Sequence, residues 1–489
     1  MCVCGRKKMM RLFFAVLLLA SNAAADDYGL AGKKIGVQLG TTGDAIASGI
    51  PDAVVERYNK AGDAVQSLLY KKVDVVVIDE QPALDFAENN NALVVSGAPL
   101  AQESYAIAVS KHNQALTAEL NRVLAELKKD RTIERILKNY IGDEKGLFPP
   151  SPRATQCPNG VLKVATNATF PPYEFYDKGQ IVGIDVDLAK IAAERMGKCA
   201  VIEDMEFDSI VAALQTGKAD IGIAGMTVTP ERLKNVDFTN TYTTAKQVVV
   251  KRADEFKTVE ELRPVRRFKE VFIQDARWKY LLTGLKTTLA VTFLAALLGI
   301  ALGTLAGVIR AAHDRSGCWR VLNFLCRAYV TVVRGTPAMI QLLIMYYVVF
   351  AAADIGKIWV AAAAFGFNSA AYVAEIVRSG IASVDAGQTE AGRSLGLTEA
   401  QTMRFIVLPQ AFKNVLPAFA NEAIALLKET SICGYIGLMD LTRGGDIIRS
   451  TTYDAVMPLA AVALIYLALV VGLTACVSKW EKRLKRNER

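Results

Sequence analysis

EAGRSLGLTEAQTMRFIVLPQ, residues Glu390 to Gln410, is the stretch that decides how the rest of the chain is organised. It is polar and compatible with helix, yet apolar runs flank it at 359–377 and 416–427. An acid near a helix start suits the helix dipole, and Gly396 permits a turn with positive φ. A chain that places such a segment between apolar runs is expected to present it to a partner.

The spacing within this stretch is specific. A Glu-Ala-Gly triplet is followed by three residues, a glycine, nine residues and an Ile-x-Leu-Pro ending. This pattern resembles the EAA signature of ABC-importer permeases, in which a short cytoplasmic helix, a turn and a second helix contact the ATPase subunit. The third position is glycine where the family has alanine, which lowers helix propensity slightly. The alternative is an ordinary cytoplasmic loop. The resemblance implies an ATPase-coupling role for Glu390, Ala391, Gly392, Gly396, Ile406, Leu408 and Pro409.

The C-terminal part of the chain is apolar enough to enter a membrane. Hydrophobic residues form 52% of the chain, and the mean hydropathy is +0.25. Segments such as YLLTGLKTTLAVT and VVRGTPAMIQLL resemble the histidine/glutamine-type permease family. The resemblance implies an all-α transmembrane permease domain over residues 275–489, with its coupling loop at 382–412. By length and hydropathy we expect about five spans, near 281–310, 336–353, 357–380, 414–436 and 455–477.

Residues 1–25 have the pattern of a secretory signal peptide. Basic residues precede the apolar core LFFAVLLLA, and three alanines at 23–25 form a small-residue cleavage site. Export would place the following segment outside the cytoplasm. Five crossings would then place residues 382–412 and the Lys/Arg-rich C-terminus in the cytoplasm, with the chain in the inner (plasma) membrane.

Two segments with alternating strand and helix signals precede the membrane part. VDVVVID at 73–79 is a continuous apolar run typical of buried parallel strands. A polar, proline-rich linker at 143–160 separates the two segments. We therefore expect α/β structure over 26–142 and again over 161–260.

Phrases in these segments carry a second resemblance. NATFPPYEF, FDSIVAALQTGKADI and GMTVTPER resemble extracytoplasmic solute-binding proteins of the polar amino-acid type, which implies two lobes of the type II periplasmic-binding-protein fold. In that family the lobe resembling 161–260 comes first, whereas here 26–142 precedes it as the second lobe plus a return segment. A circular permutation explains this order, because chain ends can be joined and a connection cut at exposed sites. The alternative is a defective permease that carries truncated receptor domains.

The candidate ligand residues suit the chemistry of a zwitterion. A guanidinium such as that of Arg232 can hold a carboxylate with two hydrogen bonds, and Asp79, at a strand end, matches the family's ammonium partner. The alternatives are a surface ion pair for Arg232 and a helix cap for Asp79. Asn167 stands where relatives that choose cationic side chains place an acid, which favours a neutral, glutamine-like substrate. The predicted ligand-binding residues are Arg232, Asp79, Gly225, Thr227, Phe170, Phe207, Asn167, Gln38 and Thr42.

Composition argues against several other classes. The chain has only 2 His, so we expect neither a His-based triad nor a His-rich metal site. The net charge of +8 concentrates beside apolar spans, which indicates membrane topology rather than a nucleic-acid partner. The chain has no GxxxxGK[ST] motif, so we expect no cofactor of its own and ATP bound by a partner subunit. Cys157 and Cys199 each precede a predicted strand, which leaves open a disulfide or two unpaired cysteines.

These resemblances imply a fused substrate-binding and permease subunit of an ABC importer for a polar amino acid, and not an enzyme. The expected partners are an ATPase subunit on another chain, a second permease copy or homologue, the amino-acid ligand and membrane lipid. A ligand-gated channel is the first alternative, but it leaves the EAA spacing unexplained. A periplasmic enzyme on the same binding fold is the second, and it would need a placed acid or base.

Overall fold

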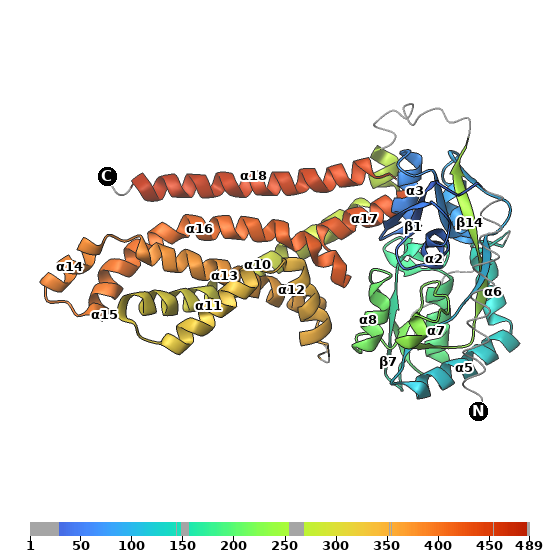
Figure 1. Ribbon diagram of the computed structural model, residues 1–489, viewed down its shortest axis with the longest axis horizontal. Helices are drawn as coiled ribbons and strands as arrows, with labels where there is room; N and C mark the ends of the chain where they lie inside the picture. Colours follow the sequence, from blue (N-terminus) through green and yellow to red (C-terminus); the bar gives the residue numbers. More distant parts are fainter. Residues whose placement is uncertain are drawn as a thin grey trace. The chain divides into compact units, whose positions relative to one another are not determined.

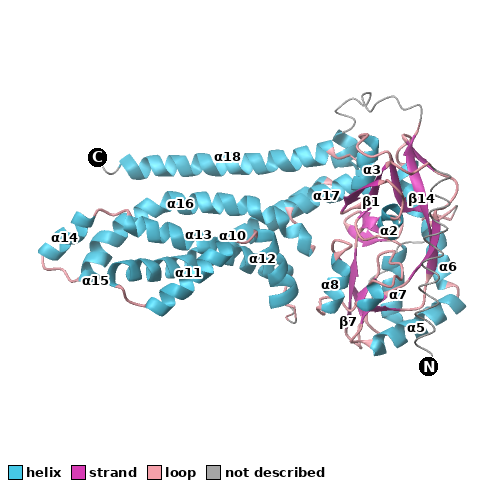
Figure 2. Cartoon of the chain, viewed as in Figure 1, coloured by secondary structure: helices cyan, strands magenta, loops and turns pink. Residues whose placement is uncertain are grey.

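The chain forms two compact units, which are described separately below. Figures 1 and 2 show that the first unit combines strands with helices and that the second is helical. The units are Met1–Arg277 with Ile447–Ala455, and Trp278–Asp446 with Val456–Arg489. The predicted signal peptide at 1–25 and part of the linker at 143–160 lie outside the residues that the structure describes. The structure is a computed structural model that describes residues 29–142, 144–147, 156–253, 268–351, 353, 355–452 and 454–486.

The first lobe of the first unit is built on a six-stranded sheet. The three strands at one side are parallel, and β3 is buried along its whole length, as the apolar run at 73–79 predicts. Helices α2 (Thr42–Ser48), α3 (Ala61–Leu69) and α4 (Glu80–Glu88) follow its strands. The strands, in spatial order, are β2 (Val54–Tyr58), β1 (Lys34–Gln38), β3 (Val75–Asp79), β14 (Thr243–Arg252) and β4 (Leu93–Val95), with β5 (Ala101–Tyr105) also on β14.

The second lobe is built on a five-stranded sheet. Three short strands that follow β7 in the chain form a separate antiparallel sheet. They are β8 (Thr169–Phe170), β9 (Glu174–Asp177) and β10 (Gln180–Val182). The strands of the main sheet, in spatial order, are β11 (Cys199–Asp204), β7 (Val161–Thr166), β12 (Ile221–Gly222), β6 (Ala108–Ser110) and β13 (Val236–Phe238). The helices of this lobe are α5 (Gln114–Lys129), α6 (Thr132–Tyr140), α7 (Ile184–Arg195) and α8 (Ser209–Gln215), with the one-turn 3-10 helix η1 (Arg232–Lys234).

The chain passes between the two sheets twice. It leaves the first sheet at the end of β5 and enters the second at β6, and it returns between β13 and β14. The lobe predicted at 161–260, which resembles the first lobe of the family, is therefore wrong at its end, since β14 pairs antiparallel with β3 in the sheet of the other lobe. Three consecutive buried valines, 248–250, need a central strand position that the edge of the second sheet does not offer.

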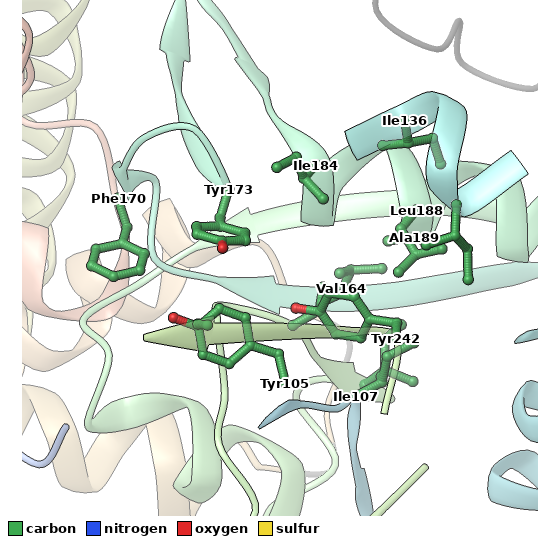
Figure 3. Close-up of a cluster of buried hydrophobic side chains, with 14 of the residues drawn as sticks. Tyr105, Ile107, Ile136, Val164, Phe170, Tyr173, Ile184, Leu188, Ala189 and Tyr242 are labelled. Carbon is green, nitrogen blue, oxygen red and sulfur yellow. The ribbon is translucent and has the colours of Figure 1, made fainter. Parts of the chain in front are cut away.

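The core of the first unit draws on both lobes. Figure 3 shows Tyr105, Tyr173 and Tyr242 gathered near Phe170, with aliphatic side chains of the second lobe beyond them. Tyr105 and Tyr242 belong to the two passages between the sheets, and both are almost fully buried. Figure 1 shows β1, α2 and α3 at one end of this unit and β7, α5 and α7 at the other. The aromatic cluster therefore fixes the passages around which the lobes are arranged.

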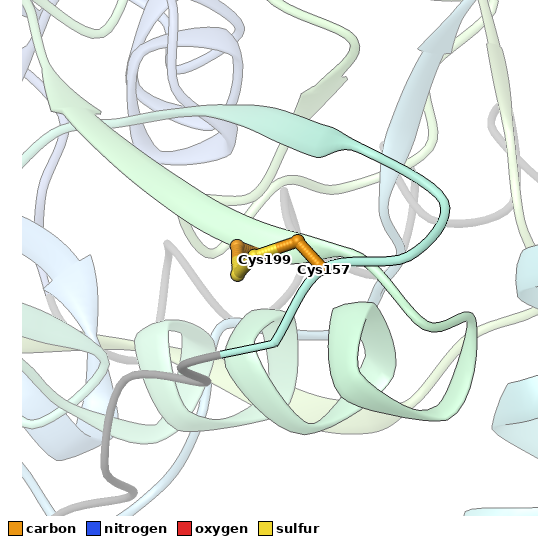
Figure 4. The surroundings of a disulfide bond; sticks show 2 residues. All are labelled: Cys157 and Cys199. Carbon is orange, nitrogen blue, oxygen red and sulfur yellow. A yellow bond between two sulfur atoms is a disulfide. The ribbon is translucent and has the colours of Figure 1, made fainter.

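Cys157 and Cys199 form a disulfide, with their Cα atoms 5.3 Å apart. β7 and β11 are parallel neighbours, with Cys199 opposite Val161, so the two thiols start from adjacent strand ends. Figure 4 shows the bond joining the segment before β7 to the start of β11. Of the two alternatives for these cysteines, the disulfide is the one that the structure contains.

The second unit consists of helices. Helix α13 packs against α10, α11 and α16, and α16 also packs against α18. Arg310 of α10 and Arg378 of α13 both pair with Glu375, at 2.6 and 2.5 Å, and this cluster ties α10 to α13. The helices are α10 (Trp278–Ser316), α11 (Arg320–Arg334), α12 (Ala338–Ile344), α13 (Lys357–Ala382), α14 (Ala386–Ser394), α15 (Glu399–Thr402), α16 (Leu408–Glu429), α17 (Leu441–Thr452) and α18 (Val456–Arg486).

The expected five spans are not all matched by long apolar helices. Among the described residues, α10, α13 and α18 are long and apolar enough to cross a membrane, and a pair bent by 108° would make a fourth. That pair joins α11 to 338–349. The predicted span at 336–353 is thus part of a bent pair, and α16, which covers most of the predicted span at 414–436, is not among the described helices that are long and apolar enough to cross a membrane.

Candidate functional site

A cleft with an empty volume of about 320 Å³ lies between the two lobes of the first unit. Parallel strands of both sheets direct their carboxyl ends towards it, which is where ligands gather in α/β folds. Gln38 and Asp79 end β1 and β3, and Asn167 follows β7. All nine predicted ligand residues line the cleft. The lining residues are Gln38, Thr41, Thr42, Asp79, Glu103, Asn167, Phe170, Glu174, Phe207, Ala224, Gly225, Thr227, Arg232 and Gln247.

Arg232, in η1, reaches across the cleft. Its Nη1 donates to the Thr227 carbonyl at 2.8 Å, and its Nη2 donates to the Gly40 carbonyl of the other lobe at 2.9 Å. The guanidinium also lies over the Phe207 ring, 5.1 Å from its centroid. These contacts use two of the five N–H groups of a guanidinium, so donors remain for a carboxylate in the cleft.

Asp79 is buried at the carboxyl end of β3. Its carboxylate accepts a hydrogen bond from the Tyr105 hydroxyl. It is the residue before α4, yet its side chain caps none of the α4 amides, so the helix-cap alternative does not hold. Burial raises the pKa of this carboxyl well above its usual range, and the nearby Glu103 raises it further. A buried carboxyl of this kind is poised to gain from an incoming ammonium group.

Gly225 occupies a position that no other residue fits well. Its φ is +53°, and a Cβ there would lie 3.2 to 3.3 Å from the rings of Phe170 and Tyr105. Its N–H donates to Asp185 at 2.8 Å. The N–H of this predicted ligand-binding residue is thus engaged by Asp185, and the glycine allows the loop to pass close to the aromatic wall.

Four polar residues of the cleft are absent from the sequence prediction, namely Thr41, Glu103, Glu174 and Gln247. Glu103 accepts from the Gln247 side chain at 2.6 Å and from the Thr227 hydroxyl, and so joins the first sheet to the loop that follows β12. Glu103 lies two residues before Tyr105 on β5, and alternate residues of a strand share one face. This alternation is the sequence signal that could have placed Glu103 on the same side as Tyr105. Glu174 lies on β9 and Gln247 on β14. Glu174 lies within the quoted phrase NATFPPYEF, which is the signal that could have found it, whereas only the sheet topology brings Gln247 to the cleft.

Asn167 is hydrogen-bonded to protein groups through both the nitrogen and the oxygen of its amide. Its amide nitrogen donates to the Met205 carbonyl at 2.8 Å. Its amide oxygen accepts from Thr169 at 2.9 Å and from Gln38 of the other lobe at 3.4 Å. Asn167 thus helps to hold the lobes together at the cleft.

The second candidate site is the segment Glu390 to Gln410, in the helical unit. Figure 1 places α14 and α15 together at one end of that unit. Asp385 caps α14, and Gly396, with φ +84°, ends it in the left-handed turn that its position predicts. Thr398 and Gln401 form a capping box that begins α15. The predicted helix, turn and second helix are therefore present.

Burial divides the predicted coupling residues into two groups. Gly392 faces inward, where an added Cβ would lie 2.8 Å from the side chains of Thr402 and Ile406, which explains glycine at the third position of the motif. Glu390, Ala391, Gly396, Leu408 and Pro409 are exposed, whereas Ile406 is half-buried. Two further apolar side chains of the segment are also exposed, Leu395 at 81% and Phe405 at 63%. An exposed apolar surface on a well-capped backbone is suited to docking.

Comparison with known proteins gives matches to both parts of the chain. A family model described as bacterial extracellular solute-binding proteins, family 3, matches residues 162–432. This range starts at the second lobe and runs into the helical unit, and the strands at 34–110 that complete both sheets precede it.

The helical part matches curated permeases along nearly their whole length. The arginine transport system permease protein ArtQ of Bacillus subtilis (strain 168) is 38% identical over 211 residues, 43% of this chain and 94% of that protein. The glutamine transport system permease protein GlnP of Escherichia coli (strain K12) is 34% identical over 208 residues, 42% of this chain and 93% of that protein. A solved structure described as an amino acid ABC transporter with histidines is 38% identical over 43% of this chain and 98% of that chain, with a TM-score of 0.41.

Proposed function

We infer the function from the premise that this chain belongs to the bacterial extracellular solute-binding proteins, family 3, and to the permeases of polar amino-acid ABC transporters. It is an amino-acid ABC importer permease that carries a solute-binding domain on the same polypeptide. Its relatives are transport subunits and not enzymes.

In the proposed cycle, the cleft between the lobes captures a polar amino acid outside the cytoplasm. Arg232 would hold the ligand carboxylate and Asp79 its ammonium group. The segment Glu390 to Gln410 would dock on an ATPase subunit supplied by another chain, and a second permease copy or homologue would complete the pathway. ATP binding by that partner would then drive the helices to open the pathway to the loaded lobes.

The single observation that carries this proposal is the convergence of the predicted ligand residues on one cleft. They come from both lobes and from segments up to 194 positions apart, Gln38 to Arg232, and all line the same cavity. Chance placement of surface ion pairs and helix caps would scatter them. The permuted order of the lobes is therefore compatible with a complete site, which two truncated receptors would not form.

The test is uptake by vesicles that contain the full chain together with the ATPase subunit that copurifies with it. We expect uptake of a labelled polar amino acid that requires ATP on the side of the coupling segment. Uptake or ion conduction without ATP would support the channel alternative and contradict the proposal. Labelling of single cysteines placed in the linker and near the C-terminus, with an impermeant reagent, would test the expected orientation of lobes outside and C-terminus inside.

The choice of one amino acid as the substrate, within the class of polar amino acids, rests only on single residues of the cleft. The neutral, glutamine-like ligand expected from Asn167 rests on the absence of an acid at that one position. The relatives are named for different amino acids, arginine and glutamine, and so do not choose between neutral and cationic side chains.

A further inference from the structure

Two buried carboxyl groups meet in the cleft. Asp79, at the end of β3, and Glu103, on β5, are each 6% exposed, and both line the cleft. They are hydrogen-bonded to each other. Among the residues that the structure describes, neither carboxyl group takes part in a salt bridge. The pair is therefore held together without a cation.

A hydrogen bond between two carboxyl groups requires a proton, because an ionised carboxylate can only accept. The surrounding donors indicate which residue carries that proton. One oxygen of Glu103 accepts from the Gln247 side chain at 2.6 Å, and the other accepts from the Thr227 hydroxyl. Donors on both oxygens favour Glu103 as the acceptor within the pair. Asp79 accepts from the Tyr105 hydroxyl through Oδ1, so Oδ2 can carry the proton that is donated to Glu103.

The electrostatic surroundings also favour a proton on Asp79. Burial raises the pKa of Asp79 well above its usual range, and the charge of Glu103 raises it further. Arg232 supplies the one positive charge among the groups that face the pair. The titratable groups that face the pair are Tyr105 of β5, Tyr173 before β9, Glu174 of β9 and Arg232 of η1. The free cleft therefore holds one proton between Asp79 and Glu103.

Glu103 belongs to the same part of the cleft as the groups proposed to hold the ligand zwitterion. Thr227 connects it to Arg232, since the Thr227 hydroxyl donates to Glu103 and the Thr227 carbonyl accepts from Arg232 at 2.8 Å. An ammonium group has three N–H donors, and Asp79 alone does not use them all. A second carboxylate in contact with Asp79 can accept another of these hydrogen bonds.

We propose that Glu103 is a second acceptor for the ligand ammonium and that the ligand displaces the proton shared by Asp79 and Glu103. The O–H bond of Asp79 breaks, the proton passes to water, and two N–H groups of the ammonium donate to the two carboxylates. The pair and its occupant carry the same net charge before and after, because an ammonium replaces a proton. The buried site thus gains hydrogen bonds without gaining charge. The proposal rests on the proposed function, which assigns the ligand ammonium to Asp79.

Binding that releases a proton weakens in acid. Asp79 is protonated in the free cleft and ionised in the complex, so protons compete with the ligand. The affinity should therefore rise about tenfold for each pH unit, and it should level off where the pH passes the pKa of Asp79 in the free cleft. A site with a permanently ionised Asp79 would show no such dependence.

The test is isothermal titration calorimetry of the purified full chain between pH 5.5 and pH 8.5, with arginine and glutamine as probes. Repeating each titration in buffers of different ionisation enthalpy gives the number of protons released per bound ligand. The wild type should release about one proton at pH 7 and bind about tenfold more tightly at pH 7 than at pH 6. Glu194→Gln, at an exposed position of α7, is the matched control and should behave as the wild type does.

Glu103→Gln should change both the affinity and the proton release. Loss of one charged acceptor should lower the affinity about tenfold. Because the charge and the hydrogen bond of Glu103 both raise the pKa of Asp79, the pH at which the affinity levels off should fall by about one unit or more. A lower affinity with the pH profile of the wild type would indicate a structural role and would overturn the proposal.

Two further results would overturn it. One is a wild type that binds a probe without releasing a proton at any pH in this range, and the other is a Glu103→Gln variant identical to the wild type. If Glu103→Gln binds neither probe, Glu103→Asp decides, because a release profile like that of the wild type supports the proposal and any other result contradicts it. A wild type that binds neither probe would instead contradict the proposed function.

Discussion

The cleft and the coupling segment place their functional groups in opposite ways. In the cleft the groups are buried polar side chains, such as Asp79, whose pKa is raised well above its usual range by burial. In the coupling segment they are exposed side chains, such as Glu390 and Leu395, on a backbone whose helix ends are capped. The cleft is suited to bind a small charged ligand, and the coupling segment presents an exposed, preformed surface on which a large partner can dock.

This difference teaches which property each region controls. A change in the cleft alters the electrostatic balance of a buried site, so it should alter ligand affinity strongly and docking not at all. A change in the coupling segment alters a surface or a turn, so it should alter transport without altering ligand affinity. The predictions below are arranged to break this separation, from the largest expected effect to the smallest.

Arg232→Ala should have the largest effect. Removing the guanidinium leaves the ligand carboxylate without its charged partner in a cleft between lobes, so affinity should fall on the order of 100- to 1000-fold. Equilibrium binding of labelled amino acids to the full chain measures this. Arg122→Ala is the control, since Arg122 pairs with Glu126 on the exposed face of α5. Equal affinity in Arg232→Ala and Arg122→Ala would remove Arg232 from the site.

Asp185→Asn should change how the stability of the first unit depends on pH. Burial raises the pKa of Asp185 to about 6, although Gly225 and Tyr242 donate to it. The folded state therefore binds this proton more tightly than the unfolded state, so the stabilisation is complete below the ordinary pKa near 4 and is lost as pH rises through about 6. The shift corresponds to an upper bound of about 3 kcal/mol.

The measurement is the urea concentration at the midpoint of unfolding of the first unit in the ligand-free chain. It is made at pH 5 and at pH 7, with pulse proteolysis as the probe of unfolding. The wild type should be more stable at pH 5, and Asp185→Asn should reduce that difference. Asp79 and Glu174, whose pKa values are also raised by burial, should leave part of the difference in place. A variant with the same pH dependence as the wild type would show that Asp185 does not titrate as its burial implies.

Glu390→Ala should lower ATP-driven uptake about tenfold, if a single charged contact at an interface contributes its usual 1 to 2 kcal/mol. Ligand affinity should stay that of the wild type, because Glu390 belongs to the other unit. The control is Glu194→Ala, at an exposed position of α7 in the first unit. A loss of ligand affinity in Glu390→Ala would break the separation between the two regions.

Gly396→Ala should have the smallest effect, a few-fold loss of uptake, because an alanine at φ +84° costs about 1 kcal/mol locally. Gly179→Ala is the matched control in the other unit, with φ +86° in the hairpin between β9 and β10. The control carries a similar backbone cost and should leave ATP hydrolysis by the partner unchanged. Equal losses of uptake in both variants would indicate a general effect of instability.

The sequence was most informative where one motif holds a complete function. The coupling segment could be predicted as helix, turn and helix because Gly396, Thr398 and Gln401 are local signals. The cleft residues could be named because the resemblance covers both lobes. Glu103 and Gln247 could not, since their meeting depends on strand pairing across residues 103 to 247.

The membrane part shows a different limit. Hydropathy predicts a span wherever apolar residues are dense, but it does not detect a bend such as that between α11 and α12. It also predicts a span at 414–436, although Glu422 lies within that range and its carboxylate accepts from Ser369 at 2.9 Å inside the helical unit. The assignment of β14 fails for a related reason, because three valines in a row favour a buried strand without saying which sheet holds it.

The most direct measurement is ATP hydrolysis by the complex of the full chain with its copurifying ATPase, with and without the amino acid that binds the cleft. Stimulation by the ligand should be present in the wild type, absent in Arg232→Ala because no ligand is captured, and absent in Glu390→Ala although its ligand affinity is intact. Ligand stimulation that persists at full strength in both variants would contradict a chain in which the cleft and the coupling segment serve one transport cycle.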